Sequence, residues 1–254
     1  MSAEKGFCSV SSAAEFVAAR ERASRELAGT GGIGTLSEKL LHKTLKFYID
    51  PNSEHHEVEY LGAVADVKNE QGIFEIQTRA FSYLIPKLRR FLEAERVTVI
   101  YPIISAKTIY WVDSETGSVG APHKTTRTGR VTDVLYEASA LAELIPHENL
   151  TVTVMLIKAD EYKRLDGWDA TRKKGATRLE RVPTELEAVT ELRTAQDYAR
   201  ILPPLPESFT AKDFSRALRL RGRRASYSLK LLRTLGVVLQ IGKKGNAFIY
   251  KLNI

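Results

Sequence analysis

Apolar residues follow two different spacings along this chain, and each spacing predicts one kind of element. A spacing of three to four residues predicts helices over 11–27, 36–48, 81–94, 131–144 and 184–201. Runs rich in β-branched and aromatic residues predict strands over 57–67, 73–78, 97–104, 108–112 and 150–158. Because helices alternate with strands, the pattern predicts an α/β (α+β) fold with a mixed central sheet flanked by helices.

Glycine, proline and charge divide the chain into four parts. A Gly-rich run at 29–32 ends the first helix, and the Pro-Pro-Leu-Pro run at 203–206 marks a boundary before the C-terminal segment. Between residues 166 and 183 the chain is charged and contains glycine, which is typical of a connection. The predicted parts are an N-terminal helix (1–30), a core domain (31–165), a basic linker with a connecting helix (166–206) and a small C-terminal domain (207–254).

The C-terminal segment carries signals for two helices followed by a strand hairpin. Thr210 and Asp213 form a capping-box pattern, and Gly222 allows a tight turn into a second helix over 225–235. Two strands joined by a basic, glycine-containing tip are predicted over 237–240 and 247–252. This order of elements resembles the winged helix-turn-helix family, in which the second helix presents its N-terminal end to a nucleic-acid groove.

Basic residues gather in the two parts of this segment that a winged helix brings to nucleic acid. Lysines at a hairpin tip would meet phosphates, which adds affinity without sequence information. The alternative is a protein-docking winged helix whose arginines are solvated. The predicted nucleic-acid contacts are Arg219, Arg221, Arg223, Arg224, Ser226, Tyr227 and Lys230 around the second helix, and Lys243 and Lys244 at the tip.

Composition narrows the class of protein and of partner. The chain has 254 residues, of which 43% are hydrophobic and 27% charged, so it can bury a core and is not expected to be disordered. Its net charge of +7 favours a polyanionic partner. A single cysteine, Cys8, excludes an internal disulfide framework and suits a reducing cytosol. The apolar runs are too short to cross a bilayer, so we expect a cytoplasmic protein without a membrane partner.

Candidate chemistry lies on the predicted hairpin of the core domain. Asp66 ends the first strand, while Glu75 and Gln77 lie two residues apart on the second and therefore on one face. Phe74 and Ile76 indicate that the opposite face is buried, which leaves Glu75 and Gln77 on the less apolar face. Carboxylates at these positions can converge on a hard divalent cation such as Mg²⁺, which prefers oxygen ligands.

A helix bearing Glu38, then Asp66, then Glu75-x-Gln77 and a further helix resembles the PD-(D/E)XK superfamily of restriction-endonuclease-like nucleases over about 35–104. The resemblance implies that Asp66, Glu75 and Glu38 bind Mg²⁺ or Mn²⁺. Gln77 takes the position of a lysine that orients or activates the attacking water. Lys87, on the following helix, could supply that positive charge instead.

The resemblance implies a metal-dependent endonuclease that acts on nucleic acid, chiefly double-stranded DNA, and leaves open whether two chains pair. A neutral amide at Gln77 cannot supply positive charge to the reacting phosphate. This departure keeps a second function open, a non-catalytic DNA-binding regulator with a degenerate nuclease-like core. Acids two apart on a strand are also often only its solvated face. His42, one turn after Glu38, is a packing residue in one interpretation and a phosphate contact in the other.

Overall fold

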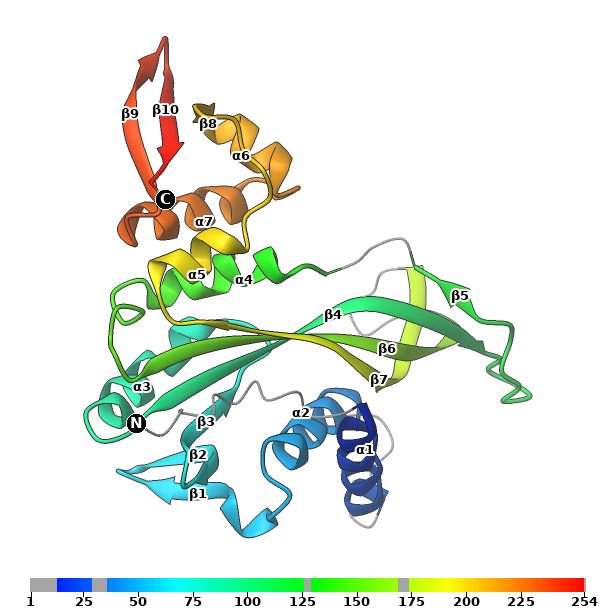
Figure 1. Cartoon of the computed structure of the whole chain (residues 1–254). Coiled ribbons are helices and arrows are strands. Elements are labelled where there is room, and N and C mark those ends of the chain that lie inside the picture. Colours follow the sequence, from blue (N-terminus) through cyan, green and yellow to red (C-terminus); the bar gives the residue numbers. More distant parts are fainter. Residues whose placement is uncertain (1–12, 29–35, 126–128, 169–173, 254) are drawn as a thin grey trace.

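A seven-stranded mixed sheet, with helices on both sides, forms the body of the protein (Figure 1). The computed structural model describes residues 13–28, 36–125, 129–168 and 174–253. Within these ranges, the side chains of 36–39, 165–168 and 174–178 are not described. The strand order is β1-β2-β3-β4-β6-β7, with β5 beside β4, so the predicted mixed α/β class is confirmed. No helix in the described ranges is long and apolar enough to span a membrane.

The elements follow one another along the chain in the order that Figure 1 labels. Those of the body are α1 (Ala13–Ala28), α2 (Leu36–Ile49), β1 (His56–Tyr60), β2 (Ala63–Asn69), β3 (Gly72–Ile76), α3 (Ile85–Leu92), β4 (Val97–Val112), β5 (His123–Lys124), α4 (Val134–Ala138), β6 (Leu150–Trp168) and β7 (Lys174–Leu192). Those of the C-terminal unit are α5 (Ala195–Arg200), β8 (Phe209–Thr210), α6 (Ala211–Ala217), α7 (Arg223–Thr234), β9 (Val238–Lys244) and β10 (Ala247–Leu252). Short 3-10 turns precede β1, α3 and α4 and follow α4.

Strand β3 lies at the centre of the part of the sheet that carries the candidate chemistry. Its neighbour β2 runs antiparallel to it and β4 runs parallel, so the chain passes through α3 between β3 and β4. Phe74 packs in a cluster with Leu45 of α2, whereas Ile73 packs in another cluster with Leu88 of α3. Both faces of β3 are therefore buried, one beneath α2 and the other beneath α3.

The strand predicted over 57–67 is in fact two strands, because the chain reverses at Leu61 and Gly62. Tyr60 pairs with Ala63, and both turn residues have positive φ, 47° for Leu61 and 71° for Gly62. Two positive φ values match the twist of a two-residue hairpin. A leucine rarely takes this conformation, so the sequence signalled the turn only through the glycine.

The strands predicted over 97–104 and 108–112 are one strand, β4, with a register shift between Ile104 and Ala106. Its parallel partner β6 continues to Trp168 instead of ending at residue 158. A short strand, β5, lies in the segment 114–130, for which the apolar pattern predicts no element, and the helix predicted over 131–144 consists of α4 between two 3-10 turns. The long sheet pairs keep β4 and β6 extended beyond the apolar runs.

The helix predicted over 184–201 is wrong, because most of it belongs to β7. That strand pairs with β6 along nearly its whole length, and Leu186 and Val189 pack against the α2 side of the core. Only α5 is helical, starting after Thr194, whose side chain accepts a hydrogen bond from the backbone of Asp197. Sheet pairing thus overrides helix propensity in the region 166–206, which was predicted as a linker with a connecting helix.

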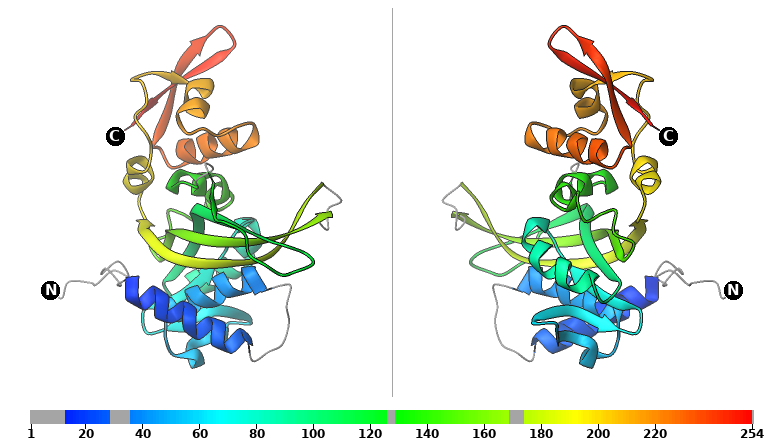
Figure 2. Two further views of the ribbon diagram at one scale, coloured as in Figure 1. Left: turned by 90° about the vertical axis from the view of Figure 1, so that its right-hand side faces the viewer. Right: turned by 90° about the vertical axis from the view of Figure 1, so that its left-hand side faces the viewer.

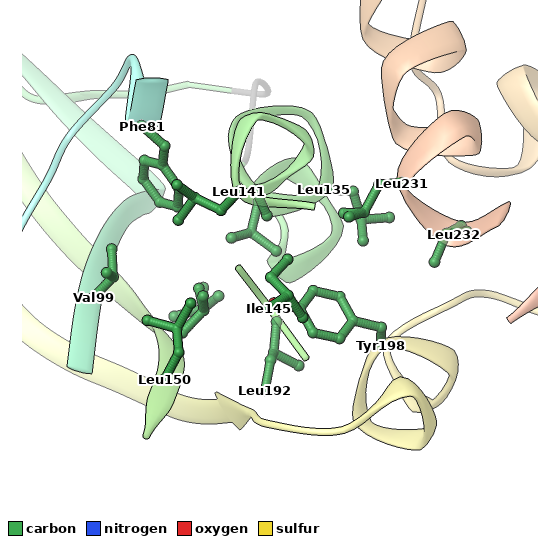
Figure 3. Packing of buried hydrophobic residues seen from close by; sticks show 14 of the residues in the cluster. Phe81, Val99, Leu135, Leu141, Ile145, Leu150, Leu192, Tyr198, Leu231 and Leu232 are labelled. Atoms are coloured by element: carbon green, nitrogen blue, oxygen red, sulfur yellow. The ribbon is translucent and has the colours of Figure 1, made fainter. Parts of the chain in front are cut away.

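One hydrophobic cluster joins the C-terminal unit to the body (Figure 3). Leu135 of α4, Tyr198 of α5 and Leu231 of α7 are fully buried in it, together with Leu192 at the end of β7. The predicted capping box of Thr210 and Asp213 is present at the start of α6. Because the same cluster contains side chains from both units, the C-terminal unit is packed on the body rather than tethered to it.

Candidate functional site

Asp66 lies where β2 separates from β3. The last residue pair of that ladder is Val67 with Phe74, and beyond it the Oδ2 atom of Asp66 accepts a hydrogen bond of 2.8 Å from the backbone N–H of Ile76. The carboxylate thereby satisfies a strand N–H that the diverging partner strand leaves without a carbonyl. This bond fixes the position of the Asp66 side chain relative to β3.

Helix α2 supplies two basic side chains to the same carboxylate. His42 Nε2 lies 3.3 Å from Oδ2 of Asp66, and Lys46 Nζ lies 3.7 Å from Oδ1. Burial by itself would raise the pKa of Asp66, but the hydrogen bond and charge of His42, the Ile76 N–H and the charge of Lys46 together lower it. Asp66 is therefore held as an anion.

Glu75 is one of the most deeply buried acids in the described chain, with 1% of its surface exposed. Its Oε2 lies 2.6 Å from Nζ of Lys87 on α3, while its Oε1 is buried without a hydrogen-bond partner in the described chain. Burial and the negative charge of Asp66 raise its pKa to about 7, and Lys87 offsets only part of this. The expectation that Glu75 lies on the less apolar face is wrong, because α3 covers that face.

The raised pKa of Glu75 has a consequence for stability. Its value in the folded protein, about 7, exceeds the ordinary 4.5, so between these values the unfolded chain ionises first and unfolding is favoured. The contribution of Glu75 to the free energy of unfolding is largest below about pH 4.5. It falls by roughly 3 kcal/mol as the pH rises through 7.

Urea denaturation from pH 5 to 8 in a chelating buffer measures this effect. The Glu75→Gln variant is expected to lack the fall that the wild type shows, because glutamine does not ionise. The same pH dependence in both proteins would contradict the raised pKa of the buried Glu75.

The other predicted catalytic residues fall in different places. Lys87 lies beside Glu75, as its prediction required. Gln77 is partly buried and its side-chain Nε2 donates a 3.4 Å bond to the backbone carbonyl of Ala80. Glu38 lies in helix α2, but its side chain is outside the described part of the chain.

Lys46 is the site residue that the sequence analysis missed. Its side chain is 7% exposed and its Nζ lies 2.9 Å from Glu57 Oε1, besides the contact with Asp66. The available signal was its spacing, since Glu38, His42 and Lys46 recur every four residues and so share one face of α2. His42 and Lys46 lie on the face of α2 that meets Asp66.

A cavity of about 430 Å³ lies beside this group and is lined by α1, α2 and the start of β1. His42 and Lys46, both in contact with Asp66, form part of its wall, with Lys43 and His56 nearby. Its two acidic wall residues are Glu26 and Glu57. Both lysines are paired with these acids, Lys43 with Glu26 and Lys46 with Glu57, so the wall of the cavity is polar and its charges are largely balanced.

A divalent cation would have carboxylate oxygens of Asp66 and Glu75 as ligands. In the described ranges, no group of three or more His, Cys, Asp and Glu side chains lies close enough to hold a metal ion. The chemistry nevertheless fits a hard cation in part, because both donors are carboxylates and Oε1 of Glu75 is buried without a hydrogen-bond partner in the described chain.

The residues predicted to bind nucleic acid lie at and around α7. Arg223, Ser226 and Lys230 are exposed on one side of the helix. Arg224 and Tyr227 both contact the ring of Tyr136 on α4, at 5.6 Å and 6.1 Å from its centroid. The remaining predicted contacts are also exposed. Arg219 and Arg221 lie in the turn before α7, and Lys243 and Lys244 lie at the β9–β10 tip. One side of α7, the helix predicted to bind nucleic acid, therefore contacts the body.

The fold and site define an α/β protein with one buried and one partly buried carboxylate, Glu75 and Asp66, at the divergence of two central strands. The sequence profile of the family described as "Domain of unknown function (DUF8091)" matches residues 39–193, more than half of the chain, so the chain belongs to this family. The matched region includes Asp66, Glu75 and Lys87 and ends directly after β7.

A protein of Treponema pallidum (strain Nichols), described as an uncharacterized protein, is similar to this chain along most of its length. The two are 29% identical over 221 residues, which cover 86% of this chain and 87% of that protein. No solved structure matches the chain.

Proposed function

We propose that the protein is a metal-dependent nuclease that hydrolyses phosphodiester bonds at Asp66 and Glu75. The observation that carries the proposal is the meeting of Asp66, Glu75 and Lys87 at one point of the sheet, with Lys87 2.6 Å from Glu75. The element order supports it, since α2, three antiparallel strands, α3 and the parallel strand β4 follow one another as the restriction-endonuclease-like resemblance implies.

The proposed reaction divides the work between the two carboxylates and their basic neighbours. Asp66 and Glu75, joined by Glu38 on the resemblance, would hold Mg²⁺ or Mn²⁺. When bound, the cation supplies Lewis-acid stabilisation of negative charge that develops on the phosphate. Lys87 provides the positive charge that Gln77 lacks, because its ammonium group is already placed at Glu75. The cavity lined by His42 and Lys46 provides room for the phosphate beside Asp66.

The proposed substrate is double-stranded DNA, guided by the C-terminal unit as a winged helix. Two helices, α6 and α7, followed by the β9–β10 hairpin support this resemblance. The exposed side of α7, with Arg223, Ser226 and Lys230, would face the DNA, while Leu231 keeps the helix on the body. A winged helix fixed on the body would keep a constant distance between the DNA-binding side of α7 and the carboxylates of Asp66 and Glu75.

Digestion of plasmid and single-stranded DNA with Mg²⁺ or Mn²⁺ tests the proposed reaction, and EDTA is expected to stop it. Gln77→Lys is expected to raise the cleavage rate about tenfold, since each ~1.4 kcal/mol of added transition-state stabilisation gives that factor. Gln77→Glu is the matched control, because it keeps the size of glutamine but introduces a negative charge instead of a positive one. It is expected to lower the rate. Cleavage that persists unchanged in EDTA would contradict a metal-dependent reaction.

A specific observation favours the second function, a non-catalytic DNA-binding regulator. Each carboxylate already has a protein cation, Lys46 at Asp66 and Lys87 at Glu75, and the Gln77 amide is bonded to Ala80. In a regulator these ion pairs would take the place of a metal and stabilise the core. DNA binding by the wild type without cleavage by either the wild type or Gln77→Lys would favour this function over the nuclease.

A further inference from the structure

Another buried carboxylate, Glu161 on β6, lies outside the proposed catalytic group and has three basic neighbours. Its Oε2 lies 2.6 Å from an Arg181 guanidinium nitrogen and 3.3 Å from Lys107 Nζ. Its Oε1 lies 3.3 Å from Lys163 Nζ. The three cations come from β7, β4 and β6, so one acid organises side chains from three adjacent strands. We call these four residues the Glu161 cluster.

The four residues of the Glu161 cluster carry a net positive charge. Glu161 is 3% exposed, and although burial would raise its pKa, the hydrogen bonds and charge of Arg181 and the charge of Lys107 lower it to about 2. One fully ionised carboxylate balances one of the three cations and leaves a net charge of +2. Like charges held close together repel, so an anion that binds there would relieve the repulsion.

The basic side chains of the cluster are partly exposed to solvent. The exposed fractions of the Lys107, Lys163 and Arg181 side chains are 27%, 27% and 23%. The three charged groups converge on one carboxylate, each within 3.3 Å of its oxygens, so they form one compact basic site of a size that suits the phosphates of a backbone. Trp111 lies beneath Lys163, with the ammonium 5.8 Å from the ring centroid, and limits its freedom.

The strands that carry the cluster continue to one end of the sheet. Figures 1 and 2 show that the distal parts of β4, β6 and β7 extend past the helices that cover the rest of the sheet. An ordinary ion pair on the same strands, Lys158 with Glu185 at 3.1 Å, contains one charge of each sign. The excess of positive charge is thus a property of the Glu161 cluster and not of every ion pair on this hairpin.

We propose that Lys107, Lys163 and Arg181 form a contact surface for the sugar-phosphate backbone of DNA, with Glu161 holding them in place. The inference rests on the proposed function and adds a second nucleic-acid contact in the body, away from the winged-helix resemblance. Phosphodiester backbones carry the regular negative charge that complements such a surface, and arginine and lysine are the side chains that bind it.

Anisotropy of a fluorescein-labelled duplex, titrated with the full-length protein at several salt concentrations in EDTA, tests the surface. Lys107→Gln and Lys163→Gln are each expected to reduce the slope of log affinity against log salt by about 0.9, the value for one lost phosphate contact. Lys158→Gln is the matched control and is expected to leave the slope unchanged. Arg181→Gln gives a third measurement, and Glu161 keeps two cations in each single variant.

The outcomes separate this inference from the function on which it rests. Wild-type slopes in folded Lys107→Gln and Lys163→Gln proteins would overturn the inference and assign the cluster a purely structural role, whatever the cleavage assays give. A reduced slope with unchanged thermal stability supports it. Loss of binding to phosphatidylserine vesicles in the variants, with DNA binding intact, would also overturn it. Failure of the wild type to bind the duplex would instead refute the DNA substrate itself.

Discussion

Replacing Asp66 with asparagine is expected to reduce Mg²⁺-dependent cleavage of DNA by at least about 100-fold, since changing even an outer partner of a metal ligand costs 10- to 100-fold. Asparagine keeps an oxygen that can accept the hydrogen bond from Ile76 N–H, so β2 and β3 should stay in place. It removes the anion that His42 and Lys46 hold and that a divalent cation needs. Glu75→Gln is expected to have an effect of similar size.

The control for this experiment is Glu59→Gln, which changes an exposed acid on the neighbouring strand β1. It should cleave at the wild-type rate. DNA affinity measured in EDTA should be nearly equal for all four proteins, because the change acts on the reaction and not on the basic surfaces. Equal cleavage by wild type, Asp66→Asn and Glu75→Gln would show that another site or a contaminant cuts the DNA.

Truncating Leu231 to alanine is expected to lower the free energy of unfolding by about 2–5 kcal/mol, the usual range for a buried leucine. Leu231 is fully buried on α7, on the side that meets α4 of the body (Figure 3). Its cluster also includes Leu135 and Tyr198. Because the cluster joins the two units, we expect the body and the C-terminal unit to unfold in one transition. The midpoint of this single transition should be lower in Leu231→Ala.

Calorimetry together with urea denaturation followed by circular dichroism measures this effect. Lys230→Ala is the matched control, because Lys230 is exposed on the same helix and its truncation should change stability by less than about 0.5 kcal/mol. Two separate transitions, with only the smaller one shifted in Leu231→Ala, would mean that the C-terminal unit folds independently of the body.

Local patterns predicted those parts of the fold that depend on neighbouring residues. The α1 and α2 helices and the Thr210 capping box lie where apolar spacing and capping residues placed them, whereas Asp66 lies within β2 rather than at its end and Gln77 lies just after β3. A helix was predicted over 184–201, but most of this segment forms strand β7. Local residues could not predict this, because the strand depends on pairing with β6 along the sheet. Contacts between distant residues therefore decided the elements that propensity predicted wrongly.

The candidate site divides in the same way. Asp66, Glu75 and Lys87 are candidates that the nuclease resemblance predicts from the order of residues along the chain. Lys46 and the burial of Glu75 were not, because both depend on how α2 and α3 cover the two faces of β3. Glu161 had no sequence signal, since its partners Lys107 and Arg181 are 54 and 20 residues away in the chain.

The sequence by itself determined which residues can carry charge or bind a cation, and where helices and hairpins begin when the signal is local. Only the tertiary structure decided that Asp66 and Glu75 are each held by a lysine, that α7 is packed on α4, and that three cations surround Glu161. The physical reason is that burial and electrostatic interaction depend on distances in space. These distances are set by the packing of whole elements, whereas sequence spacing constrains only residues within one turn or one hairpin.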